Sequence, residues 1–191
     1  MRRLTAMTLS SLHRLALARM VAFLLGAAAC AETPEPAQGD SIEATRTRAN
    51  AGGGALTDEN FFTAVALWFS DEGTATSTYG HISNWDVSAV TDMEDAFDGQ
   101  SSFNGDISLW DVSSVTDMLF MFTNAESFNG DISSWDVSSV MVMNSMFWDA
   151  ESFNQDLSGW CVTNIASEPS EFDEGADSWV LARPVWGTCP D

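Results

Sequence analysis

A 25-residue unit repeats through the middle of the chain and limits what the chain can fold into. The clearest copies are residues 103–127 (FNGDISLWDVSSVTDMLFMFTNAES) and 128–152 (FNGDISSWDVSSVMVMNSMFWDAES). A partial copy precedes them at 81–102, and another begins at Phe153 and soon breaks off. The period is marked by four tryptophans, each 25 residues apart: Trp85, Trp110, Trp135 and Trp160. One such unit cannot bury its own apolar face, so repetition at this period predicts units that stack.

Each unit carries two apolar patterns that predict different local structures. Around Trp110, Asp111 and Val112 apolar and polar residues alternate, as in a short strand with Asp facing outward. From Val115 onward the apolar residues fall at helical spacing, which predicts a helical turn or two. Stacked units would align their strands in a parallel ladder on one face, with the helical segments on the other. The sequence therefore predicts an α/β repeat solenoid of about four 25-residue units.

The repeated string FNGDISSWDVSSV, continued by Met, Met-Phe and AESFN, resembles the repeat of BspA-type bacterial surface proteins, also called the DUF285 family. The resemblance covers roughly residues 56–190. It implies a leucine-rich-repeat-like solenoid on a surface or secreted bacterial protein. Adhesion or protein interaction is the role usually suggested for that family, and the resemblance implies no particular ligand.

Residues 1–31 have the features of an export signal. Four arginines form a basic region, and the stretch MVAFLLGAAA is apolar but too short to span a bilayer. The string AAAC, which ends at Cys30, resembles a lipobox and predicts lipidation of Cys30. Ordinary cleavage after Ala29 or Ala31, or a retained anchor, fits the same residues. Residues 32–55 hold almost no large apolar side chain, which predicts a flexible tether.

Residues 56–80 are expected to cap the first repeat with a helix and a loop. Within 57–70, Thr57 or Asp58 can cap the helix, acids crowd its first turn, and Phe61, Val65, Trp68 and Phe69 form an apolar stripe. Residues 71–79 are expected to loop into the repeats, which occupy 81–165. The alternative is a helix that binds a partner.

Residues 166–191 leave the repeat pattern and are expected to form a C-terminal cap. Two cysteines remain there once Cys30 is lipidated or removed: Cys161, at a position that is Asp in other copies, and Cys189. In an exported protein such a pair predicts one disulfide, here joining the cap to the last repeat. Two free thiols are the alternative.

The charge is strongly acidic and narrows the choice of partner. The formal net charge is −21, all seven basic residues are arginine, and four of those lie within the signal. Nucleic acids and anionic lipids need positive charge on the protein, so neither is expected as a partner. A membrane is expected only through a lipid on Cys30. Cations, basic protein patches and uncharged surfaces remain, and so does the alternative that the charge serves only solubility.

The chemistry expected of an enzyme is largely missing from the sequence. The chain has no lysine, and outside the signal its only histidine is His81, at a repeat position that is aspartate in later copies. That position indicates a structural role for His81, and Cys and His are too few for a zinc site. Carboxylates are plentiful, but they recur with the repeat, as catalytic groups do not usually do. We expect no enzyme, no metal site and no cofactor, with calcium as the alternative.

Two repeating acidic positions form the candidate surface. The first column, Asp86, Asp111 and Asp136, is expected to face outward as a like-charge ladder, solvated, bonded to neighbouring serines, bridged by cations or covered by a partner. It is the tentative binding surface. The second column comprises Asp106, Asp131 and Asp156, each two residues after an asparagine. We expect these aspartates and the preceding Asn104, Asn129 and Asn154 to bond backbone groups in turns, with calcium binding as the alternative.

The aromatic and methionine positions are expected to pack inside. The four repeating tryptophans share a face with valine, which favours a core over a sugar-binding platform, and the repeating methionines, Met93, Met118 and Met143, are expected to fill gaps. We therefore expect an exported, non-enzymatic, monomeric module that binds another protein or a cell surface. It would be a surface or outer-membrane lipoprotein or a secreted protein. The alternatives are a calcium-dependent structural or adhesive domain and a carbohydrate-binding protein.

Overall fold

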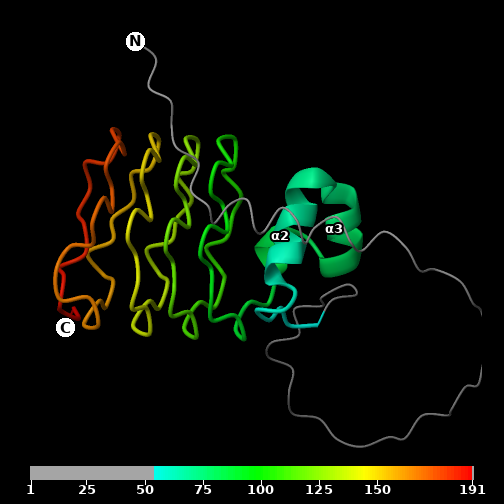
Figure 1. Ribbon diagram of the computed structural model, residues 1–191, viewed down its shortest axis with the longest axis horizontal. Coiled ribbons are helices and arrows are strands. Elements are labelled where there is room, and N and C mark those ends of the chain that lie inside the picture. The colour runs from blue at the N-terminus through cyan, green and yellow to red at the C-terminus, as the bar shows by residue number, and fades with distance from the viewer. Residues whose placement is uncertain (1–53, 191) are drawn as a thin grey trace, which may run out of the picture. The chain divides into compact units, whose positions relative to one another are not determined.

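The computed structural model describes residues 54–190. It begins with two consecutive helices, α2 (Phe61–Ser70) and α3 (Glu72–Tyr79), followed by one 3-10 turn, η1 (Ile82–Asn84). From there to the C-terminal end the chain runs in turns and extended segments. Figure 1 shows these as successive coils, one per repeat, that lie side by side and lead away from the helices.

Backbone hydrogen bonds join each coil to the next. Alternate N–H groups of one unit donate to carbonyls of the following unit, as Phe97 does to Met121 at 2.9 Å and Phe122 does to Met146 at 2.9 Å. Within residues 54–190, parallel pairing is limited to three isolated bridges: Thr57 with Ala89, Asp92 with Asp117, and Asp117 with Val142. The coils therefore touch along their backbones without forming a sheet.

The expected α/β repeat solenoid with parallel strands is wrong. Residues 54–190 contain no β-strand, and the only α-helices among them are the two short ones before the repeats. The expected helical segments fail because each unit places two residues in the left-handed region, for example Phe120 (φ 56°) and Asn124 (φ 56°), where a right-handed helix cannot continue. The expected strand at Trp110–Asp111–Val112 lies between two turns, which leaves it too short for a ladder.

Apolar side chains that recur every 25 residues form columns through the coils. The repeating tryptophans and methionines are buried, Trp110 being 3% exposed and Met118 fully buried, which confirms the expected core. The phenylalanine rings stack nearly parallel: Phe97 lies 5.4 Å from Phe122 at 3°, and Phe103 lies 5.8 Å from Phe128 at 6°. Trp110, Trp135 and Trp160 also donate their indole N–H groups to the preceding unit, as Trp110 does to the Ile82 carbonyl at 2.9 Å.

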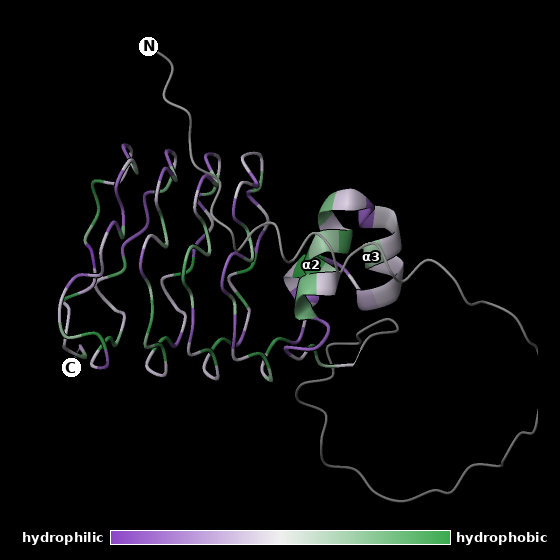
Figure 2. Cartoon of the chain, viewed as in Figure 1, coloured by the Kyte–Doolittle hydropathy of each residue, from purple (hydrophilic) through white to green (hydrophobic). Residues whose placement is uncertain are grey.

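The helices lie against the first coil. Phe61 is fully buried and its ring meets Trp110, while Phe69 meets Phe97 edge-on. Figure 2 shows α2 as largely hydrophobic and α3 as pale or hydrophilic, so α2 supplies most of the apolar contact.

The expected capping of the first helix is wrong. The helix begins at Phe61 after Asn60, and no side chain caps it and no acid lies in its first turn. Asp58 instead accepts hydrogen bonds from the backbone and hydroxyl of Thr91, at 2.7 and 2.6 Å.

The segment expected to be a loop contains α3. Asp71 caps it by accepting from the Thr74 N–H at 3.0 Å, and Gly80 (φ 82°) follows its end. Both are ordinary helix signals, so this helix was predictable from the residues at its ends.

The C-terminal residues form a last coil beside the preceding unit. Ser145, Phe147 and Asp149 donate their backbone N–H groups to Ser170, Phe172 and Glu174. A disulfide joins Cys161 to Cys189. Within the part of the chain that is described, no helix is long and apolar enough to cross a membrane. The predicted signal with Cys30, and the predicted tether except for its last two residues, lie outside the described residues.

Candidate functional site

The first acidic column is exposed and each of its carboxylates is held by a serine two residues later. Asp111 Oδ1 accepts from the Ser113 hydroxyl at 2.6 Å and from its backbone N–H at 3.2 Å. The same pair of bonds recurs at Asp86 with Ser88, and at Asp136 with Ser138. The column is therefore a set of exposed carboxylates fixed in the same local orientation in successive units. It ends where Cys161, in its disulfide, replaces the aspartate.

The second column has the same local chemistry. Asp106, Asp131 and Asp156 accept from the hydroxyl and N–H of Ser108, Ser133 and Ser158. The expectation that these side chains bond backbone groups in turns is confirmed. His81 takes the equivalent place in the first copy, where its Nδ1 lies 2.8 Å from the Ser83 hydroxyl and accepts from the Ser83 N–H at 3.3 Å. A structural role for His81 fits this geometry.

These hydrogen bonds favour the ionised carboxylates. The Ser133 hydroxyl and N–H lower the pKa of Asp131 below its ordinary value, against smaller opposing effects of burial and of the Asp106 charge. Bonds from Ser138 lower the pKa of Asp136 in the same way. The negative charge of Asp106 acts on Asp131, so these two carboxylates of the second column influence each other.

The described residues do not assemble a metal site. Between residues 54 and 190 no group of three or more His, Cys, Asp or Glu side chains is placed to hold an ion together. Each column carboxylate uses one oxygen to accept from its own serine, as Asp111 and Asp131 do. The carboxylates of a column therefore stand singly, one per unit, and do not form a cluster.

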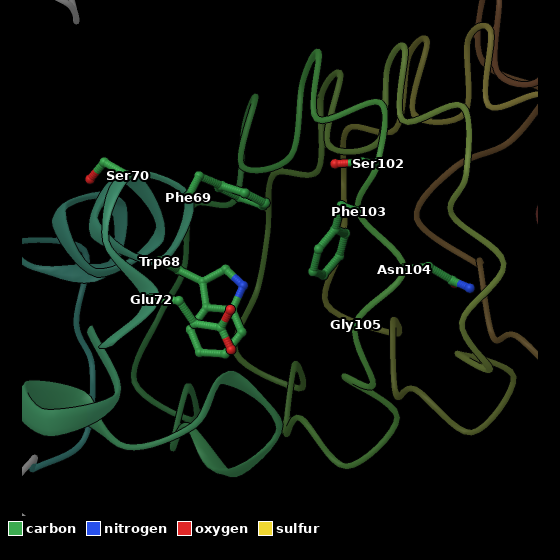
Figure 3. A pocket seen from close by; sticks show the side chains of 8 residues that line it. All are labelled: Trp68, Phe69, Ser70, Glu72, Ser102, Phe103, Asn104 and Gly105. Atoms are coloured by element: carbon green, nitrogen blue, oxygen red, sulfur yellow. The ribbon is translucent and has the colours of Figure 1, made fainter. Parts of the chain in front are cut away.

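A hollow of about 360 Å³ lies between the helices and the loop at residues 102–105. Figure 3 shows Trp68, Phe69 and Glu72 on the helical side and residues 102–105 on the other. Trp68 and Phe69 are half-buried and Glu72 is exposed, so aromatic and charged groups meet there. The hollow therefore has a mixed apolar and polar lining.

An asparagine ladder begins at Asn104, which lines the hollow, and runs along the repeats. Asn104 Oδ1 accepts from the Asn129 N–H at 2.9 Å, and Asn129 Oδ1 accepts from the Asn154 N–H at 2.9 Å. At the end of the ladder, Asn154 Oδ1 accepts from the N–H groups of Val180 and Leu181. The Asn104 N–H, at the other end, has no acceptor among the described residues. It is therefore available beside the hollow.

Sequence reasoning placed the columns and correctly expected Asn104, Asn129 and Asn154 to bond backbone groups. It missed the hollow, and it missed that the asparagine bonds join successive units into a ladder. The ladder had a signal, since Asn follows Phe in each unit. The hollow had no such signal, because it depends on where α2 packs.

Comparison with curated proteins and with solved structures gave no match. A family model described as "Mycoplasma protein of unknown function, DUF285" matches residues 65–179.

Proposed function

The chain belongs to the DUF285 family, and from this premise we propose that it is an exported, non-enzymatic interaction module of the BspA type whose exposed first acidic column binds a basic protein surface. The observation that carries the proposal is the geometry of that column. Each carboxylate is exposed, charged and held by its own serine at the same position in successive units. A partner with regularly spaced cations would meet charges already held in place.

The charge of the whole chain supports the same class of partner. At a net charge of −21 with no lysine, long-range attraction favours cationic surfaces and speeds their encounter with the protein. Export, with lipidation at Cys30 or release after cleavage, is part of the proposal and rests on the first 31 residues.

The test is a variant that removes charge while keeping the turns. In Asp86→Asn, Asp111→Asn and Asp136→Asn combined, the amide oxygen can still accept from each serine. We expect this variant to keep its melting temperature and to retain far less of the basic cell-surface proteins that the wild type captures. Binding should also weaken with salt in the wild type.

The second column supplies the matched control. Asp106→Asn, Asp131→Asn and Asp156→Asn combined remove the same charge from the equivalent turns. Equal losses from the two variants would mean that only total charge matters. Undiminished capture by the first-column variant would reject the proposed surface. Capture that requires calcium and is lost in chelator would instead favour the calcium-dependent adhesive alternative.

The hollow supports carbohydrate binding as a second candidate function. A half-buried Trp68 beside Phe69, the Glu72 carboxylate and the open Asn104 N–H offers an apolar wall and hydrogen-bonding groups together. Binding to a glycan array that Glu72→Gln abolishes, with Glu126→Gln as control, would support it. An array with no signal for the wild type would reject it.

A further inference from the structure

Within residues 54–190, the last coil has a row of backbone N–H donors without acceptors, whereas the equivalent donors of all the preceding units are hydrogen-bonded. In the unit before it, the N–H groups of Ser145, Phe147 and Asp149 donate to the last coil at 3.0, 2.8 and 2.7 Å. Their counterparts in the last coil are Glu171, Asp173 and Gly175. The correspondence follows from the backbone, because Glu171 (φ 55°) and Gly175 (φ 81°) repeat the left-handed conformations of Ser145 (φ 52°) and Asp149 (φ 54°).

These three N–H groups have no acceptor among the described residues. Glu171 is exposed, and Asp173 and Gly175 are half-buried, so the edge is accessible to solvent. At the opposite end of the coils the helices are in place, with Phe69 against Phe97 and Phe103. Among residues 54–190 no such helix lies at the C-terminal edge. Unpaired donors at alternate residues are what an added extended segment pairs with.

The charge around this edge selects the kind of segment. Five acids lie within residues 168–177: Glu168, Glu171, Asp173, Glu174 and Asp177. The only arginine in the described part of the chain is Arg183, which lies beside these acids and pairs with Asp173 at 2.9 Å. A second copy of this chain is a poor occupant, because each copy carries a net charge of −21.

We propose that the C-terminal edge binds an extended peptide segment rich in lysine or arginine. Alternate carbonyls of the segment accept from the N–H groups of Glu171, Asp173 and Gly175, and its cations lie beside the five acids. The exposed side chains of Val180 (80%) and Leu181 (44%), in the same coil, offer apolar contact to residues between the cations. The site is separate from the acidic columns and does not depend on them.

The probe is a nine-residue peptide of alternating lysine and valine, tested against the same peptide with glutamate in place of lysine. Residue-resolved amide hydrogen exchange on the full folded domain is the readout. The lysine peptide should slow exchange at residues 171, 173 and 175, about tenfold or more when nearly saturating, and the glutamate peptide should not. Unchanged exchange at all three amides with bound lysine peptide would overturn the proposal.

A second experiment reverses the charge of two acids near the edge whose own N–H groups are not the proposed donors. Glu174→Lys with Asp177→Lys should weaken peptide binding about tenfold or more, because each reversal places like charges together. The matched control is Glu126→Lys with Glu151→Lys, two exposed acids of earlier units, which should change it much less. Equal weakening by both pairs would mean a diffuse charge effect and reject the site. Concentration-dependent dimers without peptide, with protection at these amides, would show that a second copy is the occupant and overturn the assignment.

Discussion

The aromatic rings of the interior and those of the ends pack in different ways. Between interior units the rings lie nearly parallel, as for Phe97 on Phe122 at 3° and Phe128 on Phe153 at 11°. At both ends they turn edge-on: Phe69 meets Phe97 at 84°, and Phe153 meets Trp179 at 85°. Equivalent phenylalanines in successive units lie in the same orientation, so their rings stack face to face. At an end, a ring packs edge-on over the last phenylalanine ring and so covers it without exposing another ring face. The interior packing therefore follows from the repeat, and the packing at the ends follows from residues outside it.

The largest effect that would separate the two regions is expected from tryptophan truncation. Trp110→Ala removes a 3%-exposed ring that contacts Phe61, Trp85 and Phe97, and should cost about 3–5 kcal/mol. Trp186→Ala removes a half-buried ring of the last coil and should cost clearly less. Urea unfolding of both variants provides the measurement. Equal costs would show that the ends are as tightly packed as the interior.

Loss of the disulfide should affect the C-terminal end more than the interior. The bond closes a span of 28 residues, and replacing both cysteines by serine should lower stability by about 3 kcal/mol. Amide exchange should quicken first in residues 166–190 and only later in the units before Trp135. A uniform increase along the chain would mean that the last coil and the interior unfold as one.

A glycine substitution tests how closely the repeating loops pack. A Cβ on Gly130 would lie 2.9 Å from Phe128 Cε2, whereas one on Gly159 would meet nothing within 4 Å. Gly130→Ala should therefore cost about 1–2 kcal/mol from overpacking, and Gly159→Ala should cost little. Thermal melting of the two variants, side by side, would show the contrast, and a harmless Gly130→Ala would mean that the ring moves aside easily.

The smallest expected effect concerns the carboxylate columns. Ser133→Ala removes the hydroxyl donor to Asp131 and should raise the Asp131 pKa toward its ordinary value, with Ser134→Ala as an inert neighbour. Because the folded pKa is depressed, the stabilisation from this group is present above the ordinary pKa, 3.8, and is lost as pH falls through the lower folded pKa. Carboxyl titration by NMR measures the shift. An unchanged Asp131 pKa would show that the Ser133 hydroxyl does not lower it.

The sequence predicted which residues are buried better than it predicted the backbone. The spacing of Trp110 and Met118 identified the core because burial repeats with the unit. The helix expected after Val115 does not form, since Phe120 adopts positive φ, a choice that neither residue type nor spacing signals. The first-column carboxylates, from Asp86 to Asp136, were correctly placed on the outside. The hollow could not be predicted, because it is formed by Trp68 and Phe103 from segments that meet only after folding.

The asparagine ladder has a consequence for how such a chain can change its length. Each rung joins residues 25 apart, as Asn104 to Asn129 does. A duplicated or deleted segment of 25 residues would leave every rung matched, whereas a single-residue insertion would put all the columns after it out of register. The family can thus be expected to vary in whole units, with growth placed before residue 166, because the left-handed positions of the last coil are already shifted to 171 and 175.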